Sequence, residues 1–346
     1  MGVSNLSLIF GLILLHVMIF ISQCECRPDP STSGRHLLKL VSVPPTLVTY
    51  HNGLTLSSRP ETSSSPIYLI WYGDFSDSQK SIVRDFFTSF QSSSLQTPSV
   101  SSWWKPLQAY VDSRGSSIPS EIHLEAEISD SSCSKGKSLN KLDLEDLVVG
   151  SVRDGLFPAD AHGFYLLLTA EDVSVEGFCR SSCGSHASTR PVVETQDKHL
   201  VFGWVGNSVK QCAGRCAWPY ARPDFGNQMS PPLLAPNGDV GMDGLIINVA
   251  AILAGGFTNP FGNGYYQGDA GAPLEAATAC SGVYGPGAFP GFPGELSRDV
   301  ITGVSFNAFG ANDRRSFYSQ MTGILTPDAS DLCAREKSWI YNVLIS

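Results

Sequence analysis

The chain has 346 residues, of which 42% are hydrophobic and 16% are charged, and its formal net charge is −9 at pH 7. This composition is that of a compact globular protein, and the length is sufficient for one large hydrophobic core. The negative charge and the lack of a basic cluster exclude nucleic acid as an expected partner, because nucleic-acid binding needs a positive surface.

Residues 1–26 are predicted to be a secretory signal peptide. Residues 6–21 form an apolar run that is shorter than the roughly 20 residues of a comfortable membrane span, and Cys24 and Cys26 follow it. No Lys or Arg precedes the run, which leaves an uncleaved anchor as the alternative. We expect a secreted protein in which no later stretch is apolar for long enough to cross a membrane.

The first predicted elements follow an irregular lead-in. Residues 27–62 are rich in Pro, Ser, Thr and Arg, with one early strand expected near residues 46–50. Residues 67–73 are continuously apolar and predict a buried strand. Residues 77–90 predict a helix capped by Asp77, because apolar residues recur there at helical spacing.

Further helices and strands alternate along the chain. Residues 103–111 and 142–152 predict helices, and residues 121–128 predict a strand with one solvated face. Residues 164–169 and 200–205 predict two more buried strands. This order predicts an α+β fold with a single domain, residues 38–335, in which helices flank a central mixed sheet.

An apolar helix is predicted over residues 244–254, and a long loop rich in glycine, proline and aromatic residues follows it. Of the 33 glycines, 11 lie between residues 255 and 294. Glycine permits positive φ and close backbone approach, and proline makes a loop rigid. The many aromatic residues argue against disorder, so we expect this loop to belong to the folded body.

Seven cysteines remain after the predicted signal peptide. Secretion favours disulfides, whereas the two C-x-x-x-C pairs also permit a four-thiolate zinc site, which is the weaker alternative. An odd number leaves one cysteine unpaired or paired with another chain. The seven are Cys133, Cys179, Cys183, Cys212, Cys216, Cys280 and Cys333.

Common catalytic motifs are missing from the sequence. Neither G-x-S-x-G nor H-E-x-x-H occurs. Residues 262–268 resemble a dinucleotide-binding loop only superficially, because they follow a helix and not a strand. We therefore predict no catalytic residue, no cofactor and no metal site.

A few individual side chains allow a functional and a structural interpretation. His186 could act as an acid–base group or ligand, but a structural role is favoured because spacing identifies no partner carboxylate. Asp239 and Asp243 look like paired carboxylates; we favour a turn role for Asp239 and a helix cap for Asp243.

Two pairs of aromatic residues could stack on sugars. They are Trp103 with Trp104 and Tyr265 with Tyr266. Burial in the core is the favoured interpretation of both pairs, because aromatic side chains dominate core packing.

Nine segments contain distinctive motifs: residues 67–73, 79–85, 179–186, 205–208, 211–219, 231–232, 235–241, 258–268 and 272–276. Together, and in this order, they resemble one known family, the plant Exordium / phosphate-induced protein family. The resemblance covers nearly the whole mature chain, residues 38–335.

The resemblance implies a secreted protein of the apoplast and cell wall that promotes growth in a brassinosteroid-dependent manner. It implies no established catalytic activity, so a non-enzymatic role with an unknown extracellular protein or wall component as partner is favoured. The alternative is an extracellular hydrolase that acts on wall polymer or peptide through a site that the motifs do not reveal.

Among the cysteines, we predict that Cys280 pairs with Cys333. Cys179, Cys183, Cys212 and Cys216 are expected to pair among themselves, in one of three connectivities. Cys133 stands where the family implies no cysteine and is expected to be free. Residues 336–346 form a tail longer than the resemblance implies.

The predicted helix 244–254 and the Thr-Asn-Pro that follows it are similar to the active-site region of zincin-like metallopeptidases. Counting back from Thr258, the residues that would bind zinc and activate water are Ala251, Ile252 and Gly255. None of them can bind a metal or move a proton. We expect either a degenerate zincin-like scaffold or a plain core helix, and no zinc in both cases.

Overall fold

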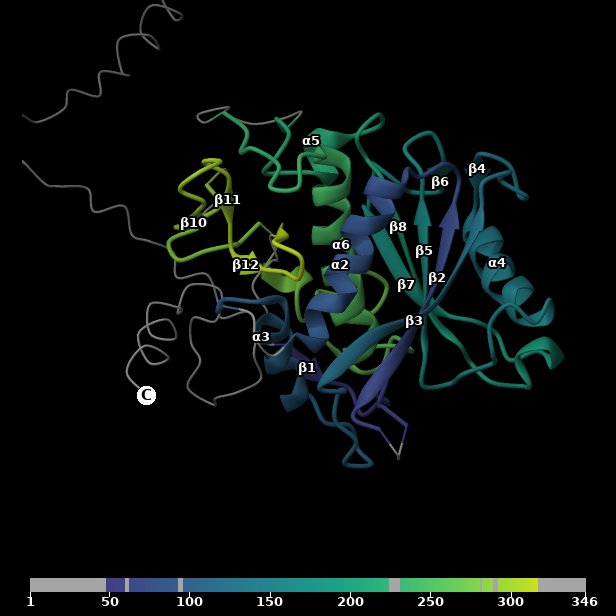
Figure 1. Ribbon diagram of the computed structural model, residues 1–346. Coiled ribbons are helices and arrows are strands. Elements are labelled where there is room, and N and C mark those ends of the chain that lie inside the picture. Colours follow the sequence, from purple (N-terminus) through teal and green to yellow (C-terminus); the bar gives the residue numbers. More distant parts are fainter. Residues whose placement is uncertain are drawn as a thin grey trace, which may run out of the picture. The chain divides into compact units, whose positions relative to one another are not determined.

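The computed structural model describes residues 48–59, 62–92, 96–223, 231–280, 282–288 and 292–316. All of them lie within one compact unit, Pro44–Ser346. The predicted signal peptide, most of the lead-in, Cys333 and the tail lie outside the described residues. The described chain is an α+β domain with a mixed central sheet flanked by helices, as predicted (Figure 1).

The central sheet has five strands in the order β3-β2-β5-β8-β7. The first four are mutually parallel, and β7 runs antiparallel to β8 at one edge. Their bounds are β2 Ser64–Tyr72, β3 Glu121–Asp130, β5 Phe164–Thr169, β7 Gly184–Ser188 and β8 Val201–Gly206. The predicted strands are confirmed. No strand was predicted at β7.

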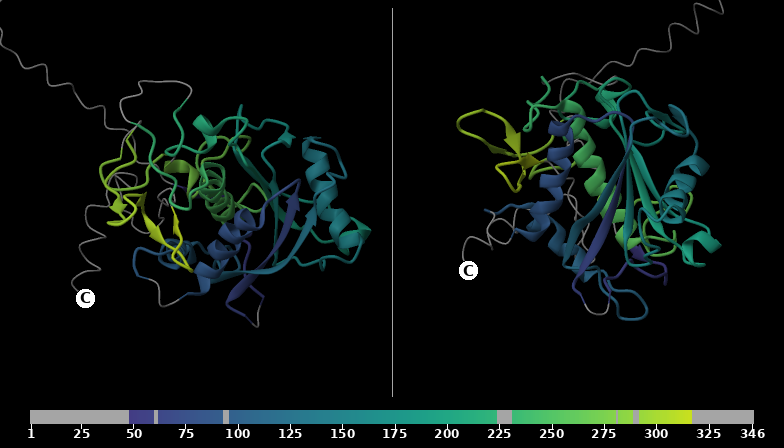
Figure 2. Two further views of the ribbon diagram at one scale, coloured as in Figure 1. Left: turned by 45° about the horizontal axis from the view of Figure 1, so that its top comes forward. Right: turned by 45° about the vertical axis from the view of Figure 1, so that its right-hand side comes forward.

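Helices cover both faces of this sheet. Helices α2 (Asp77–Gln91) and α6 (Val240–Thr258) lie on one face, and α4 (Lys141–Arg153) lies on the other (Figures 1 and 2). Consecutive strand residues point to opposite faces, so the three inner strands β2, β5 and β8 contribute side chains to two cores. In β5, for example, Leu166 belongs to the α2/α6 core and Leu167 to the α4 core.

The helix starts are set by capping side chains. Ser76, and not Asp77 as predicted, caps α2, and it forms a reciprocal capping box with Gln79. Asn140 caps α4 by accepting from two backbone N–H groups. The expected helix at 103–111 is a short helix α3 (Val100–Trp104) that continues as a 3₁₀ turn, Lys105–Ala109.

Helix α6 is longer than the predicted 244–254 at both ends, and nearly every side chain in it is buried. By length and composition it could cross a membrane, so the expectation of no further such stretch was wrong. However, 83% of its most apolar window is buried inside the protein. Helix α6 is therefore the core helix of this domain, and it packs against β7 and β8.

The remaining elements are short. Helix α5 spans Ala213–Cys216, and two further 3₁₀ turns span Val193–Thr195 and Thr278–Cys280. Four two-stranded pairs complete the described fold. They are β1 (Thr49–Tyr50) with β9 (Tyr265–Tyr266), β4 (Ser138–Leu139) with β6 (Ser174–Val175), β10 (Ser297–Arg298) with β11 (Ser305–Phe306), and β12 (Ala308–Phe309) with β13 (Arg315–Ser316).

Candidate functional site

A buried histidine–carboxylate pair lies between β7 and the C-terminal end of α6. His186 Nε2 is 2.9 Å from each carboxylate oxygen of Glu275, and Asn259 Nδ2 donates to Glu275 Oε1 at 2.8 Å. The side chains of His186 and Glu275 are only 11% and 7% exposed. Both carboxylate oxygens of Glu275 therefore have a hydrogen-bond partner.

Three separate segments supply the three side chains. His186 is in the middle of β7, Asn259 ends α6, and Glu275 precedes the 3₁₀ turn Thr278–Cys280. The backbone N–H of Glu275 donates to Thr278 Oγ1, and Asn259 Oδ1 accepts from the Gly264 N–H. The cluster therefore fixes the loop after α6 against the edge of the sheet.

Two adjacent glycines of α6 make room for this arrangement. A Cβ on Gly255 would lie 2.2 Å from Glu275 Oε2, and a Cβ on Gly256 would lie 2.4 Å from Phe164 Cε2. Each glycine inside a helix costs about 1 kcal/mol relative to alanine. The close approach of a buried carboxylate and an aromatic ring explains why both positions lack a side chain.

The pair leaves one histidine nitrogen without a partner. Nε2 is committed to Glu275, while the buried Nδ1 has no hydrogen-bond partner among the described residues. A carboxylate that orients an imidazole is part of many acid–base sites, but no hydroxyl or thiol in the described chain hydrogen-bonds to His186. The cluster thus has an orienting acid and a base, without a paired nucleophile.

Sequence spacing identified no carboxylate partner for His186, and the structure corrects this: Glu275 is its partner. Glu275 is 89 residues away along the chain, so spacing could not reveal it. The only sequence signal is that His186, Asn259 and Glu275 each lie in a segment on which the family resemblance rests.

The degenerate zincin positions lie beside this cluster. Gly255 is against Glu275 and His186, and Ile252 is buried against Gly184 and Gly203. No group of three or more His, Cys, Asp or Glu side chains in the described part of the chain could hold a metal ion. The zincin-like origin of the helix stays a prediction.

The two aspartates at the start of α6 have exchanged roles relative to the prediction. Asp239 is the cap, since its Oδ1 accepts from the Met242 N–H at 3.0 Å. Asp243 is 3% exposed and accepts from the backbone and side-chain amides of Asn237. Burial raises the pKa of Asp243 to about 7.

Two disulfides hold the segment before β7. Cys179 bonds to Cys212 and Cys183 to Cys216, with a sequence separation of 33 in each pair. This selects one of the three connectivities and replaces the zinc alternative. Cys280 is also disulfide-bonded, to a partner outside the described residues, so its pairing with Cys333 stays a prediction. Cys133 is free and buried, as expected.

The aromatic pairs belong to the core. Trp104, Tyr265 and Tyr266 are buried, and Trp103 packs partly buried against the same core. Tyr265 stacks on Tyr50 with ring centroids 4.5 Å apart. None of these rings forms an open platform for a sugar.

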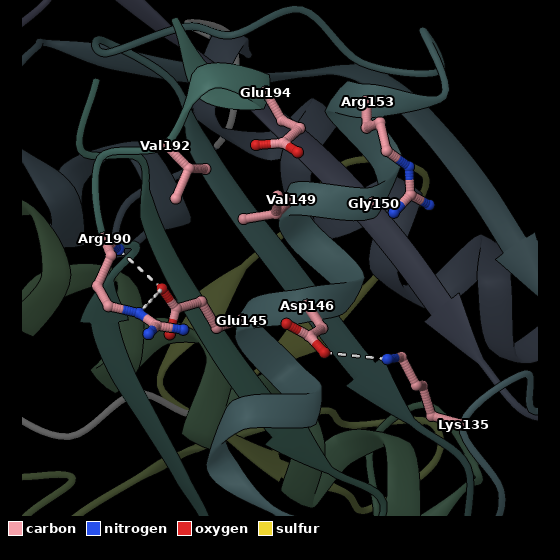
Figure 3. A pocket seen from close by; sticks show the side chains of 9 residues that line it. All are labelled: Lys135, Glu145, Asp146, Val149, Gly150, Arg153, Arg190, Val192 and Glu194. Atoms are coloured by element: carbon pink, nitrogen blue, oxygen red, sulfur yellow. Dashed lines mark hydrogen bonds and ion pairs between the residues drawn. The ribbon is translucent and has the colours of Figure 1, made fainter. Parts of the chain in front are cut away.

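A charged hollow of about 280 Å³ lies on the outer side of α4 (Figure 3). Three cations and three carboxylates line it, but Lys135 is paired with Asp146 and Arg190 with Glu145. Arg153 is paired with Asp154. These exposed pairs neutralise one another, so the hollow presents no strong field to a charged ligand.

Comparisons with known proteins agree with the resemblance drawn from the motifs. Residues 48–328 match the family described as Phosphate-induced protein 1 conserved region. The chain is 43% identical to Protein PHOSPHATE-INDUCED 1 of Nicotiana tabacum over 307 residues, which cover 87% of this chain and 92% of that protein.

Two relatives from Arabidopsis thaliana are equally similar. Protein EXORDIUM is 44% identical over 314 residues (88% of this chain, 94% of that protein), and Protein EXORDIUM-like 1 is 44% identical over 272 residues (77% and 84%). No solved structure matches the chain. The identity over most of both chains and the match of the family region lead to one conclusion: the chain belongs to the Exordium / phosphate-induced protein family.

Proposed function

We propose that this protein is secreted to the apoplast, associates with the cell wall, and promotes growth in brassinosteroid-dependent regulation. It acts without catalysis, by binding an extracellular protein or a wall component. The family membership supports this proposal, together with the apolar run at residues 6–21 and its cysteine-flanked end.

The observation that carries the proposal furthest is the pair of disulfides beside β7. Cys179–Cys212 and Cys183–Cys216 tie the segment before this edge strand to the turn and helix α5 after β8. Disulfides of this kind form and persist in oxidising compartments, which supports a secreted protein whose sheet edge is held rigidly.

One observation favours the alternative of an extracellular hydrolase. Glu275 orients His186, and the second nitrogen of His186 is unpaired, which is the arrangement of a general base. We rank this function second because general-base catalysis on a wall polymer or peptide needs an accessible site, whereas the pair is enclosed between β7, α6 and the loop after it.

Secretion and growth can be tested with the same set of tagged proteins. The full chain is expected to reach the apoplast of a plant cell, and the same chain without residues 1–26 is expected to stay inside. Seedlings that overproduce the secreted form are expected to grow more, with a dependence on brassinosteroid supply. Equal growth with the secreted and the leaderless forms would contradict the proposal.

The variant His186→Gln separates the two functions. Glutamine can still donate a hydrogen bond to Glu275 but cannot act as a base near neutral pH. A binding protein is expected to keep its growth effect in this variant, provided that circular dichroism shows an intact fold. A hydrolase would lose the effect while its secreted amount stays the same.

A further inference from the structure

The two edges of the central sheet are built differently. At one edge, β3 carries three glutamates, one aspartate and one histidine in ten residues. At the other edge, β7 reads Gly-Ser-His-Ala-Ser and has no Lys, Pro or carboxylate. Charged side chains on an edge strand prevent pairing with other chains, so β3 is protected and β7 is not.

The register of β7 on β8 shows which backbone groups face outward. Cys183 and Gly206 form a hydrogen-bonded pair before the strand, and Thr189 and Leu200 form one after it. Because hydrogen-bonded and non-hydrogen-bonded pairs alternate in an antiparallel ladder, Gly184, His186 and Ser188 direct their N–H and C=O groups away from β8.

These outward groups have no hydrogen-bond partner anywhere in the described structure. No residue of β7 is fully buried: Ser185 and Ala187 are exposed, and the three residues with outward backbone groups are partly exposed. It is held rigidly by the disulfide at Cys183 and by the contact of His186 with Glu275. A rigid row of unpaired backbone groups is a template for an added strand.

The surroundings of β7 indicate the chemistry of such a strand. No acidic residue lies between Glu176 and Glu194 in the sequence. Of the two arginines that flank β7, Arg180 is exposed, whereas Arg190 is paired with Glu145. Phe261 and Leu274, which follow Asn259 and precede Glu275 closely in sequence, are exposed apolar side chains. The edge therefore suits an extended segment with an acidic end next to Arg180 and apolar side chains at alternate positions.

We propose that β7 is the docking edge of this protein, and that an extended acidic segment of a partner protein binds to it by adding a strand to the sheet. The inference rests on the proposed function in that it names the surface by which the protein binds. It depends neither on secretion nor on growth, so a binding experiment can fail while the growth experiment succeeds, and the reverse.

The test uses the mature chain and a synthetic peptide, acetyl-Glu-Val-Thr-Val-Thr-Val-Glu-amide. We expect the peptide to protect the amide hydrogens of Gly184, His186 and Ser188 from exchange and to leave those of β3 unchanged. The version with lysine at both ends is expected to bind about tenfold more weakly, because it meets the exposed Arg180 with like charge. Protection at β3, or none at β7, would overturn the proposal.

Methyl groups on alternate backbone nitrogens of the peptide give a second test that needs no protein variant. An extended strand directs only every second N–H toward its neighbour. Of the two possible methylation patterns, one is expected to abolish binding and the other to leave it within about twofold. Equal binding by both patterns would overturn the added strand.

The protein variant Ser188→Pro removes one outward N–H without touching the ladder with β8, and Ser188→Ala is its matched control. We expect about tenfold weaker peptide binding for the proline variant and none of this loss for the alanine variant. If the free protein already shows concentration-dependent protection of Gly184 and His186, a second copy covers the edge, and the proposal of a partner segment is wrong.

Discussion

The two ends of α6 each bury a carboxyl group, and they satisfy it in different ways. At the C-terminal end, Glu275 is hydrogen-bonded by His186 and Asn259. At the N-terminal end, the carboxyl group of Asp243 accepts from the backbone and side-chain amides of Asn237 and from no other described residue. A protonated imidazole can compensate the charge of a buried carboxylate. Neutral amides supply hydrogen bonds but no opposite charge, so the desolvation cost of the carboxylate is less fully compensated.

The two ends of the helix therefore differ in how they contribute to stability and to its dependence on pH. The C-terminal end is a packing and hydrogen-bonding centre that joins three segments. The N-terminal end has a carboxyl group whose pKa burial raises to about 7, so its charge changes with pH near neutrality. Four predictions test this contrast, in order of decreasing effect.

The largest effect is expected for Gly255→Val. A Cβ at this position would lie 2.2 Å from Glu275 Oε2, so the carboxylate must leave His186. Overpacking together with an uncompensated buried charge is expected to destabilise by about 4 kcal/mol in urea unfolding. The control is Gly150→Ala in α4, where a Cβ meets only Arg153 Nη2 at 3.6 Å; it is expected to stabilise by about 1 kcal/mol. Equal effects of the two changes would contradict the packing argument.

The second prediction concerns pH at the other end of the helix. The pKa of Asp243 is raised by burial to about 7 in the folded protein, from 3.8 for an unperturbed aspartate, so the folded state binds more protons between these two pH values. The free energy of unfolding is therefore expected to fall as pH rises from 4 to 7, by at most about 4 kcal/mol from this group.

Urea unfolding at several pH values measures this slope, and Asp243→Asn is the control because its amide does not titrate. The slope between pH 4 and 7 is expected to be smaller in the variant than in the parent protein. A variant with an unchanged slope would assign the pH dependence to other groups. Asp160 has the opposite effect on stability. Hydrogen bonds from His162, Arg59 and Tyr68 lower its pKa despite its burial, so its contribution to the free energy of unfolding is lost as the pH falls below about 4.

The third prediction compares two histidine–glutamate pairs. Glu275→Gln weakens a buried pair and is expected to cost about 2 kcal/mol. Glu125→Gln weakens the exposed pair with His123 on β3, where Nε2 and Oε2 are 3.0 Å apart, and is expected to cost less than about 0.5 kcal/mol. Thermal or urea unfolding of both variants measures the difference. Similar losses would mean that enclosure of the first pair has no energetic consequence.

The smallest effect is expected for the cap. Asp239→Ala removes the acceptor for the Met242 N–H and is expected to destabilise by about 1 kcal/mol. Asp239→Asn keeps an acceptor oxygen and is expected to lose less than half of that. Alanine also removes the acceptor for Gln79 Nε2. If alanine costs nothing in urea unfolding, the packing of α6 fixes the helix start without either hydrogen bond.

Local patterns in the sequence determined most of the elements of the sheet and its helices. The strands at 64–72, 164–169 and 201–206 and helices α2 and α4 follow from apolar runs and helical spacing, since these patterns report which faces are buried. The apolar composition of α6 was evident as well. Its ends were not, because Gly255 and Gly256 look like the start of a loop when their neighbours are unknown.

Tertiary structure alone decided the features that depend on distant contacts. The sequence Gly-Ser-His-Ala-Ser has no strand pattern, and β7 forms because β8 offers a partner and two disulfides hold its start. The choice among three disulfide connectivities required the positions of Cys212 and Cys216 relative to β7. His186 and Glu275 are far apart in the chain and meet because the glycines of α6 let the loop that follows approach the sheet. The spacing of residues along the sequence cannot predict this contact.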